Sequence, residues 1–212
     1  MQRQKNIIDC YNKTAREYAD SFGDELSKKH LDCILLQSFA WDNAVKGTTI
    51  DLGCGPGQTT RYLFDCGCKD IIGIDLSSEM VSIAAKLHPQ IKFETADMLK
   101  LKYADNRFGS ALAFYSIVHF DYDQIKAAFA EIKRVLKSGG EFLFSFHIGV
   151  ETIHLDQFLD QEVDIDFYFF ETARIVNLLH ETGLGVVDII EREPYPDVEH
   201  PSRRAYIWAK KS

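Results

Sequence analysis

The feature of this sequence that most clearly could do chemistry is a loop, Asp51–Gly57, that combines one acid with three glycines. It follows an apolar run that predicts a strand and precedes a run that predicts a helix. The acid is Asp51, and Gly53, Gly55 and Gly57 would let the chain turn sharply and let a ligand touch bare backbone. Because free N–H groups at the start of a helix hold carboxylates or phosphates, the loop predicts a nucleotide-type cofactor site. The alternative is a turn that only links the two elements.

The spacing within this loop separates two classes of cofactor. A dinucleotide loop, G-x-G-x-x-G, would start at Gly53 and need glycine or alanine where this chain has Gln58. The pattern D-x-G-x-G-x-G instead resembles the first motif of the class I methyltransferases that depend on S-adenosylmethionine (SAM). By that resemblance the loop backbone cradles the methionine part of SAM, and Asp51 helps to hold its ammonium. The electrostatics agree, because a carboxylate suits an ammonium and ill suits a pyrophosphate.

A second acid, Asp75, ends the apolar run Ile71–Asp75, eighteen residues beyond Gly57. A carboxylate there can accept hydrogen bonds from both ribose hydroxyls of an adenosine, a group that SAM and NAD share. The alternative is an Asp that only caps the following helix. The surrounding pattern, I-D-x-S-x-x-M, is common in the same family, and the resemblance implies that Leu76 and Met80 line the adenine face.

A third acid, Asp97, follows the next apolar run. A single Asp after a strand is usually just a turn residue. The segment Thr95–Met98, however, resembles the third motif of the family, in which the Asp accepts the adenine amino group and a neighbour contacts the ring. The resemblance therefore places Ala96, Asp97 and Met98 in the cofactor site.

The fourth apolar run leads to a candidate for acceptor chemistry. The segment Phe108–Ser116 resembles the fourth motif, whose C-terminal end meets both SAM and substrate, and this places Tyr115 in the site. Gly109 departs from the acid that many relatives have near the start of this strand. His119 lies just beyond and is a candidate general base toward an oxygen or nitrogen nucleophile, since the ordinary pKa of histidine is about 6.5. The alternative is a structural histidine.

No further catalytic constellation is expected for this chemistry. Displacement from a sulfonium needs no metal and no covalent intermediate, only positioning and a water-poor site. The sequence therefore predicts a SAM-dependent methyltransferase acting on a small-molecule acceptor, and the whole chain resembles uncharacterised bacterial members of the family. Two alternatives stay open, a nucleotide-cofactor (NAD-type) oxidoreductase and a non-catalytic SAM-binding protein.

The elements that must position these residues follow from the alternation of short apolar runs with longer amphipathic ones. This alternation predicts an α/β fold with a doubly wound, Rossmann-like, seven-stranded sheet, mostly parallel with an antiparallel C-terminal strand. The expected strands are Thr48–Leu52, Asp70–Asp75, Ile91–Thr95, Gly109–Tyr115, Glu141–Phe146, Val186–Glu191 and Ala205–Ala209. The expected helices between them are Gln58–Asp65, Ser77–Leu87, Tyr122–Leu136 and Glu171–Glu181. Ser77 is a natural N-cap, and Gly183 a natural helix terminator.

A chain of 212 residues is long enough for a single domain over 1–212 and short for two. Its first 45 residues contain two helical runs, the second about Ser27–Asn43, and resemble the helical lid that many small-molecule methyltransferases place over SAM. Tyr11, Asn12 and Tyr18 fall where this lid often contacts cofactor or substrate. The alternative for the tyrosines is packing in an amphipathic helix.

Two further segments are candidates for substrate specificity. The insertion 151–171 holds seven acids and no Lys or Arg, together with a cluster of aromatic residues. It could form an anionic, apolar wall that favours a cationic or neutral aromatic acceptor, or simply a solvated face over a core. Arg203 and Arg204 could pair with this insertion or hold a substrate carboxylate.

Composition limits the partners of the chain. A net charge of −8 argues against a nucleic-acid partner. Five cysteines without a C-x-x-C pair suit free thiols in a reducing compartment and give no zinc signature. The N-terminus lacks a signal-peptide core, and charges interrupt every apolar run before it could span a membrane. We therefore expect a cytoplasmic protein without metal or membrane partner, and leave open whether it forms a homodimer.

Overall fold

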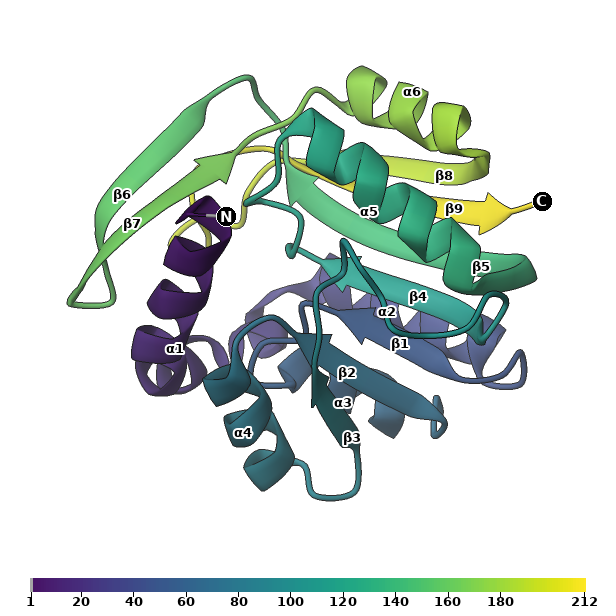
Figure 1. Ribbon diagram of the computed structural model, residues 1–212, viewed down its shortest axis with the longest axis horizontal. Helices are drawn as coiled ribbons and strands as arrows, with labels where there is room; N and C mark the ends of the chain where they lie inside the picture. The colour runs from purple at the N-terminus through teal and green to yellow at the C-terminus, as the bar shows by residue number, and fades with distance from the viewer. Residues whose placement is uncertain (1) are drawn as a thin grey trace.

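One seven-stranded sheet dominates the structure, a computed structural model that describes residues 2–212 (Figure 1). Its strands are β1 (Thr49–Leu52), β2 (Ile71–Asp75), β3 (Lys92–Thr95), β4 (Phe108–Phe114), β5 (Leu136–His147), β8 (Leu184–Arg192) and β9 (Arg204–Lys211). They lie in the order β3-β2-β1-β4-β5-β9-β8, with parallel neighbours from β3 to β5. β9 runs antiparallel to both β5 and β8. The predicted doubly wound sheet with an antiparallel C-terminal strand is confirmed.

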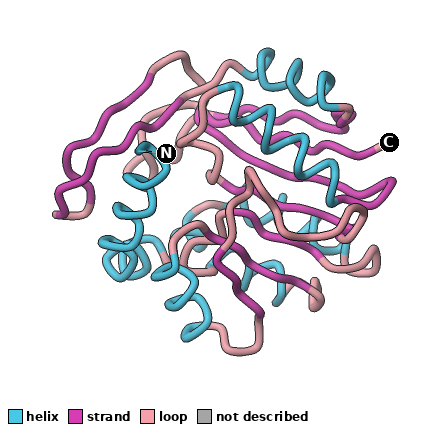
Figure 2. Tube along the Cα trace, in the orientation of Figure 1, coloured by secondary structure: helices cyan, strands magenta, loops and turns pink. Residues whose placement is uncertain are grey.

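Helices cover both faces of this sheet (Figure 2). On one face, α2 (His30–Asn43) and α3 (Gln58–Asp65) pack against the sheet through a cluster that includes Leu36, Leu63 and Leu143. On the other face, α5 (Tyr122–Val135) and α6 (Thr172–Thr182) pack through a cluster that includes Phe129 and Phe142. Because Phe142 and Leu143 are adjacent in β5, they point to opposite faces and serve opposite cores.

Most helix ends lie where the sequence predicts them. The hydroxyl of Ser77 accepts a hydrogen bond from the backbone N–H of Met80 and caps α4 (Ser78–Leu87). Gly183 ends α6 in the left-handed region, with φ 79°. The second N-terminal helix differs, because a 3-10 turn, η1 (Glu25–Lys28), precedes α2. Lys29 between them has φ −118° and ψ 78°, so the helix expected from Ser27 begins only at His30.

The insertion 151–171 contains a feature that the sequence analysis missed, a separate β-hairpin. Its strands, β6 (Thr152–Phe158) and β7 (Gln161–Tyr168), are antiparallel. Leu159 and Asp160 form the turn with φ values of 48° and 60°, the left-handed pair of a tight hairpin connection. The N-terminal helix α1 (Gln2–Phe22) lies beside β7, so hairpin and helix form one layer next to the main sheet (Figure 1).

Three further features bear on the surroundings of the chain. Within residues 2–212, no helix combines the length and the hydropathy that crossing a membrane requires. Over the same residues, no group of three or more His, Cys, Asp or Glu side chains is arranged to hold a metal ion. The five cysteines are free thiols.

Candidate functional site

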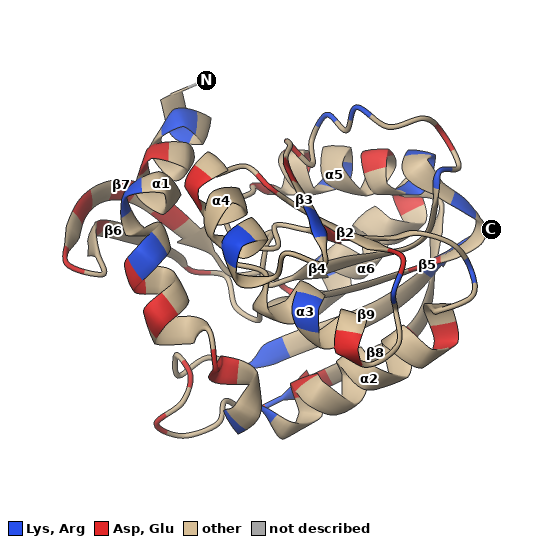
Figure 3. Ribbon diagram, turned by 90° about the horizontal axis from the view of Figure 1, so that it is seen from below, with Lys and Arg blue, Asp and Glu red and all other residues tan. Residues whose placement is uncertain are grey.

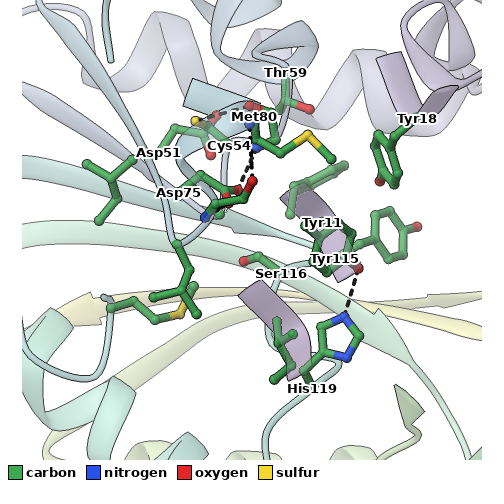
Figure 4. Close-up of a pocket in the computed structure, with 18 of the residues that line it drawn as sticks. Tyr11, Tyr18, Asp51, Cys54, Thr59, Asp75, Met80, Tyr115, Ser116 and His119 are labelled. Carbon is green, nitrogen blue, oxygen red and sulfur yellow. Dashed lines mark hydrogen bonds between the residues drawn. The ribbon is translucent and has the colours of Figure 1, made fainter. Parts of the chain in front are cut away.

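The main pocket lies at the carboxyl ends of the central strands, where the strand order reverses between β1 and β4. Open α/β sheets bind ligands at this kind of switch point. Ends of β1, β2 and β4 and residues of α1 and η1 line the pocket. Figure 4 shows Tyr11 and Tyr18 of α1 together with Asp51 and Asp75 at this pocket. The pocket is lined by all the predicted site residues except Gly57, namely Asp51, Gly53, Gly55, Asp75, Leu76, Met80, Ala96, Asp97, Met98, Tyr115 and His119. Their individual roles stay predictions.

The glycine loop passes close to another segment of the chain at Gly53, as its composition suggests. Gly53 has φ +73°, and a Cβ added there would lie 2.4 Å from the Cβ of Ser116. Gly57, in contrast, faces away from the pocket and starts α3 with φ +88°. A Cβ on Gly57 would lie 2.9 Å from ring atoms of His88 and Phe93. Gly57 therefore shapes the loop without lining the pocket.

Asp51 is almost fully buried at the end of β1, with 1% of its surface exposed. Its carboxylate accepts a hydrogen bond from the hydroxyl of Thr60 at 2.5 Å. Burial raises the pKa of Asp51 to about 7, a rise that Thr60 opposes and the charge of Asp75 increases. A cationic group beside this carboxylate would restore its charge, as an ammonium does. The pattern of the glycine loop gives no indication that Thr60 contacts Asp51.

Asp75 is held by backbone groups on both of its oxygens. One oxygen accepts from the N–H of Gly55 at 2.9 Å, and the other accepts from the N–H of Ser77 at 2.8 Å. Burial raises the pKa of Asp75, and these hydrogen bonds oppose that rise. Since a carboxylate has about four acceptor positions, Asp75 can still accept bonds from a diol.

Asp97 also lines the pocket and connects the segment after β3 to α1. One oxygen accepts from the backbone N–H of Leu99 at 2.8 Å, and the other accepts from the side-chain amide of Gln4 at 2.7 Å. Gln4 was not among the predicted site residues, although it stands seven residues before Tyr11 on one helical face.

His119 is buried and has a defined tautomer. Its Nδ1 lies 2.7 Å from the backbone oxygen of Asp166 in β7, which can only accept, so Nδ1 carries the hydrogen. Its Nε2, 2.7 Å from the hydroxyl of Tyr11, therefore accepts a hydrogen bond from Tyr11 (Figure 4). Burial, together with the charge of Arg3, lowers the pKa of His119 to about 4. The imidazole is thus neutral at neutral pH and free to accept a proton, although the lowered pKa makes it a weaker base than an exposed histidine.

Of the three lid residues predicted to contact a ligand, two line the pocket. Tyr11 and Tyr18 do so from α1. Asn12 instead accepts hydrogen bonds from the hydroxyl of Ser77 at 2.7 Å and from the N–H of Glu79 at 3.3 Å. It therefore ties α1 to the start of α4 and does not line the pocket.

The charged side chains of the other two specificity candidates do not line the pocket. Six of the seven acids of the insertion are exposed, and none of the seven lines the pocket. Figure 3 shows acidic positions, in red, along the hairpin β6–β7. They form the solvated face that was the alternative expectation. Arg203 pairs with Glu191 at 2.9 Å, and Arg204 pairs with Glu199 at 3.2 Å. Both arginines therefore pair within the C-terminal segment 184–211 and not with the insertion.

Comparison with known proteins points to one family. A family model described as "Methyltransferase domain" matches residues 50–140. The putative methyltransferase 235L of Invertebrate iridescent virus 6 is 29% identical over 150 residues, which cover 70% of this chain and 52% of that protein. The chain spans about half the length of the first curated relatives it matches.

Solved structures extend the likeness to the whole fold. Magnesium protoporphyrin IX methyltransferase from Synechocystis, solved with bound SAM, superimposes with a TM-score of 0.75 and 14% identity, covering 100% of this chain and 98% of that one. A 1,6-didemethyltoxoflavin N1-methyltransferase from Burkholderia thailandensis gives a TM-score of 0.73 and 18% identity, covering 98% and 88%. At these identities the likeness shows the fold alone.

Proposed function

We propose that this chain, which belongs to the class I SAM-dependent methyltransferase family, binds SAM in the main pocket and transfers its methyl group to a small-molecule acceptor. The observation that carries the proposal is the convergence of Asp51, Asp75 and Asp97 on one pocket from the ends of three adjacent strands. Each acid matches a different polar part of SAM. Asp51 would hold the ammonium, Asp75 the ribose hydroxyls and Asp97 the adenine amino group.

The residues present fit SAM in two further respects. The backbone at Gly53 and Gly55 is bare where a ligand must approach closely. The hydroxyl oxygen of Ser116 and the amide oxygen of Gln58 line the pocket and are buried without a hydrogen-bond partner among residues 2–212. Buried polar atoms are normally paired, so these two favour a polar ligand.

When bound, SAM would supply an electrophilic methyl group on sulfur. The chain would supply positioning and exclusion of water, with α1 covering the pocket. Methylation of an oxygen or nitrogen also releases a proton from the acceptor. The Tyr11 hydroxyl can take this proton while passing its own to Nε2 of His119, and the Asp166 carbonyl supports the imidazolium that forms. In this proposal His119 acts as the base through Tyr11.

The proposal also covers the size of the acceptor and the compartment of the protein. The pocket is enclosed by α1, which favours a small acceptor over a folded macromolecule. The free thiols favour a reducing compartment, and we therefore place the protein in the cytoplasm.

Calorimetry with SAM, S-adenosylhomocysteine and NAD tests the cofactor assignment. We expect both sulfur compounds to bind and NAD not to bind. Asp75→Ala should weaken SAM by about 1–3 kcal/mol, because charged hydrogen bonds to the ribose are lost. Asp70→Ala, just before the same strand and exposed, is the matched control and should leave affinity unchanged. Binding of NAD in place of SAM would refute the proposal.

A further inference from the structure

A second set of polar residues reaches the main pocket from the side opposite Asp75 and Asp97. Its centre is Asp32, in the first turn of α2, which is fully buried and also lines the pocket. One carboxylate oxygen, Oδ1, accepts from the hydroxyl of Tyr206 at 2.6 Å and from Arg192 at 2.9 Å. The other oxygen, Oδ2, is buried and has no hydrogen-bond partner within the described part of the chain.

The position of Asp32 separates it from the proposed SAM contacts. Tyr206 belongs to β9, which stands three places from β1 in the sheet order, on the side away from β2 and β3. The acids assigned to the ribose and adenine follow β2 and β3. The pocket therefore extends past the cofactor acids toward β9, and Asp32 marks that extension.

Asp32 is fixed in place by an ion network. Arg192 makes two hydrogen bonds to Glu199, at 2.7 and 2.9 Å, and that carboxylate also pairs with Arg204 at 3.2 Å. Lys29 pairs with Glu25 at 2.5 Å and lies 3.5 Å from Glu199. Three acids thus balance three bases, so the network as a whole is neutral. A bound group is then selected by the free oxygen and not by net charge.

The walls beside Asp32 are aromatic. Tyr115 and Phe114 line the pocket, and the hydroxyls of Tyr115 and Tyr206 are 2.7 Å apart. The ammonium of Lys29 lies 5.3 Å from the centre of the Tyr115 ring. Tyr115 has φ 54°, a left-handed conformation that is unusual for a residue with a side chain. The end of β4 is therefore bent at the place where its ring faces the pocket.

Resting on the proposed function, we propose that Asp32 determines acceptor specificity, with Oδ2 accepting a hydrogen bond from a neutral O–H or N–H group on an aromatic acceptor. An unpaired buried oxygen destabilises the protein, and a donor from the ligand removes that penalty. The same oxygen repels a carboxylate and gains nothing from a hydrocarbon. The acceptor class is thus a neutral aromatic hydroxyl or amino compound.

Ligand-detected NMR on the protein saturated with S-adenosylhomocysteine tests this inference, with phenol, anisole and benzoate as probes. Phenol and anisole differ only in the donor hydrogen and its replacement by methyl. We expect phenol to bind at least about tenfold more tightly than either other probe. Equal binding of phenol and anisole would overturn the inference without any variant being needed.

The variant Asp32→Asn extends the test, because an amide can present a donor where Oδ2 stood. We expect the preference for phenol over anisole to disappear, while affinity for S-adenosylhomocysteine stays unchanged. Asp42→Asn, an exposed position on the same helix, is the control and should keep the preference. Loss of cofactor affinity in Asp32→Asn would assign Asp32 to the cofactor and overturn the inference. Failure of the wild-type protein to bind S-adenosylhomocysteine would instead refute the proposed function.

Discussion

Asp51→Asn should stabilise the ligand-free protein and weaken SAM binding, because burial makes the ionised form of this carboxyl unfavourable in the folded state. Burial raises its pKa from an ordinary value of 3.8 to about 7, a shift of about three pH units. At about 1.4 kcal/mol per unit, the shift corresponds to about 4 kcal/mol. Since the folded pKa is the higher one, the folded state binds the extra proton. The wild-type protein therefore loses stability as the pH rises from about 4 to about 7.

Urea unfolding of both proteins at pH 5 and pH 8.5 measures this effect. At pH 8.5 the variant should be more stable by about 4 kcal/mol, the full penalty of ionising Asp51. At pH 5 the folded protein still keeps Asp51 protonated, and the pH is only about one unit above the ordinary pKa. The difference in the free energy of unfolding should therefore fall to about 2 kcal/mol. The amide oxygen of the variant can still accept the Thr60 hydrogen bond, which keeps packing comparable.

Asp20→Asn, exposed on α1, is the control and should show no pH-dependent difference. A gap between Asp51→Asn and wild type that is equal at both pH values would refute the reasoning. So would a variant that is less stable at pH 8.5. Calorimetry with SAM at pH 8.5 completes the test, because loss of the ionised carboxylate should weaken binding of the ammonium. Equal affinity would remove Asp51 from that role.

Three other predictions follow from the same site. His119→Ala should lower turnover at least about tenfold with unchanged affinity for S-adenosylhomocysteine, measured by methyl transfer and calorimetry; equal turnover would make His119 structural. Gly53→Ala should destabilise the fold by about 1–2 kcal/mol from its positive φ alone, and more through the Cβ of Ser116, 2.4 Å from the added Cβ. Urea unfolding checks this, and an unchanged midpoint would contradict it. Arg192→Ala should cost about 3–5 kcal/mol, because it leaves Glu199 buried without its main partner; a loss under about 1 kcal/mol in thermal unfolding would show that the network is not coupled.

The main sheet could be predicted because its signals are local. Each strand is a short apolar run followed by a turn residue, and Gly53, Asp75 and Asp97 fall at the ends of such runs. The parallel order then brings these ends to one edge, as any doubly wound sheet does. The local pattern was therefore enough to predict that Asp51, Asp75 and Asp97 line one pocket.

The remaining parts of the site depend on contacts between distant segments. Asp32 meets Tyr206 from 174 residues away, and Gln4 meets Asp97 from 93 residues away. Neither pair has a spacing that a sequence pattern reveals. The hairpin β6–β7, in contrast, does have a local signal, although acids dominate the composition of the insertion. Its alternation, with Ile165 buried between exposed Asp164 and half-buried Asp166, was the signal of a strand.

The helix α1 connects the parts of the pocket that the sheet alone leaves separate. Gln4 contacts Asp97, Asn12 contacts Ser77, and Tyr11 contacts His119. All three contacts lie on one helical face, because positions 11 and 12 follow position 4 by seven and eight residues, which is about two turns. A ligand that displaces α1 therefore breaks all three contacts together. The Tyr11–His119 hydrogen bond therefore depends on the same helix that contacts Asp97 and Ser77.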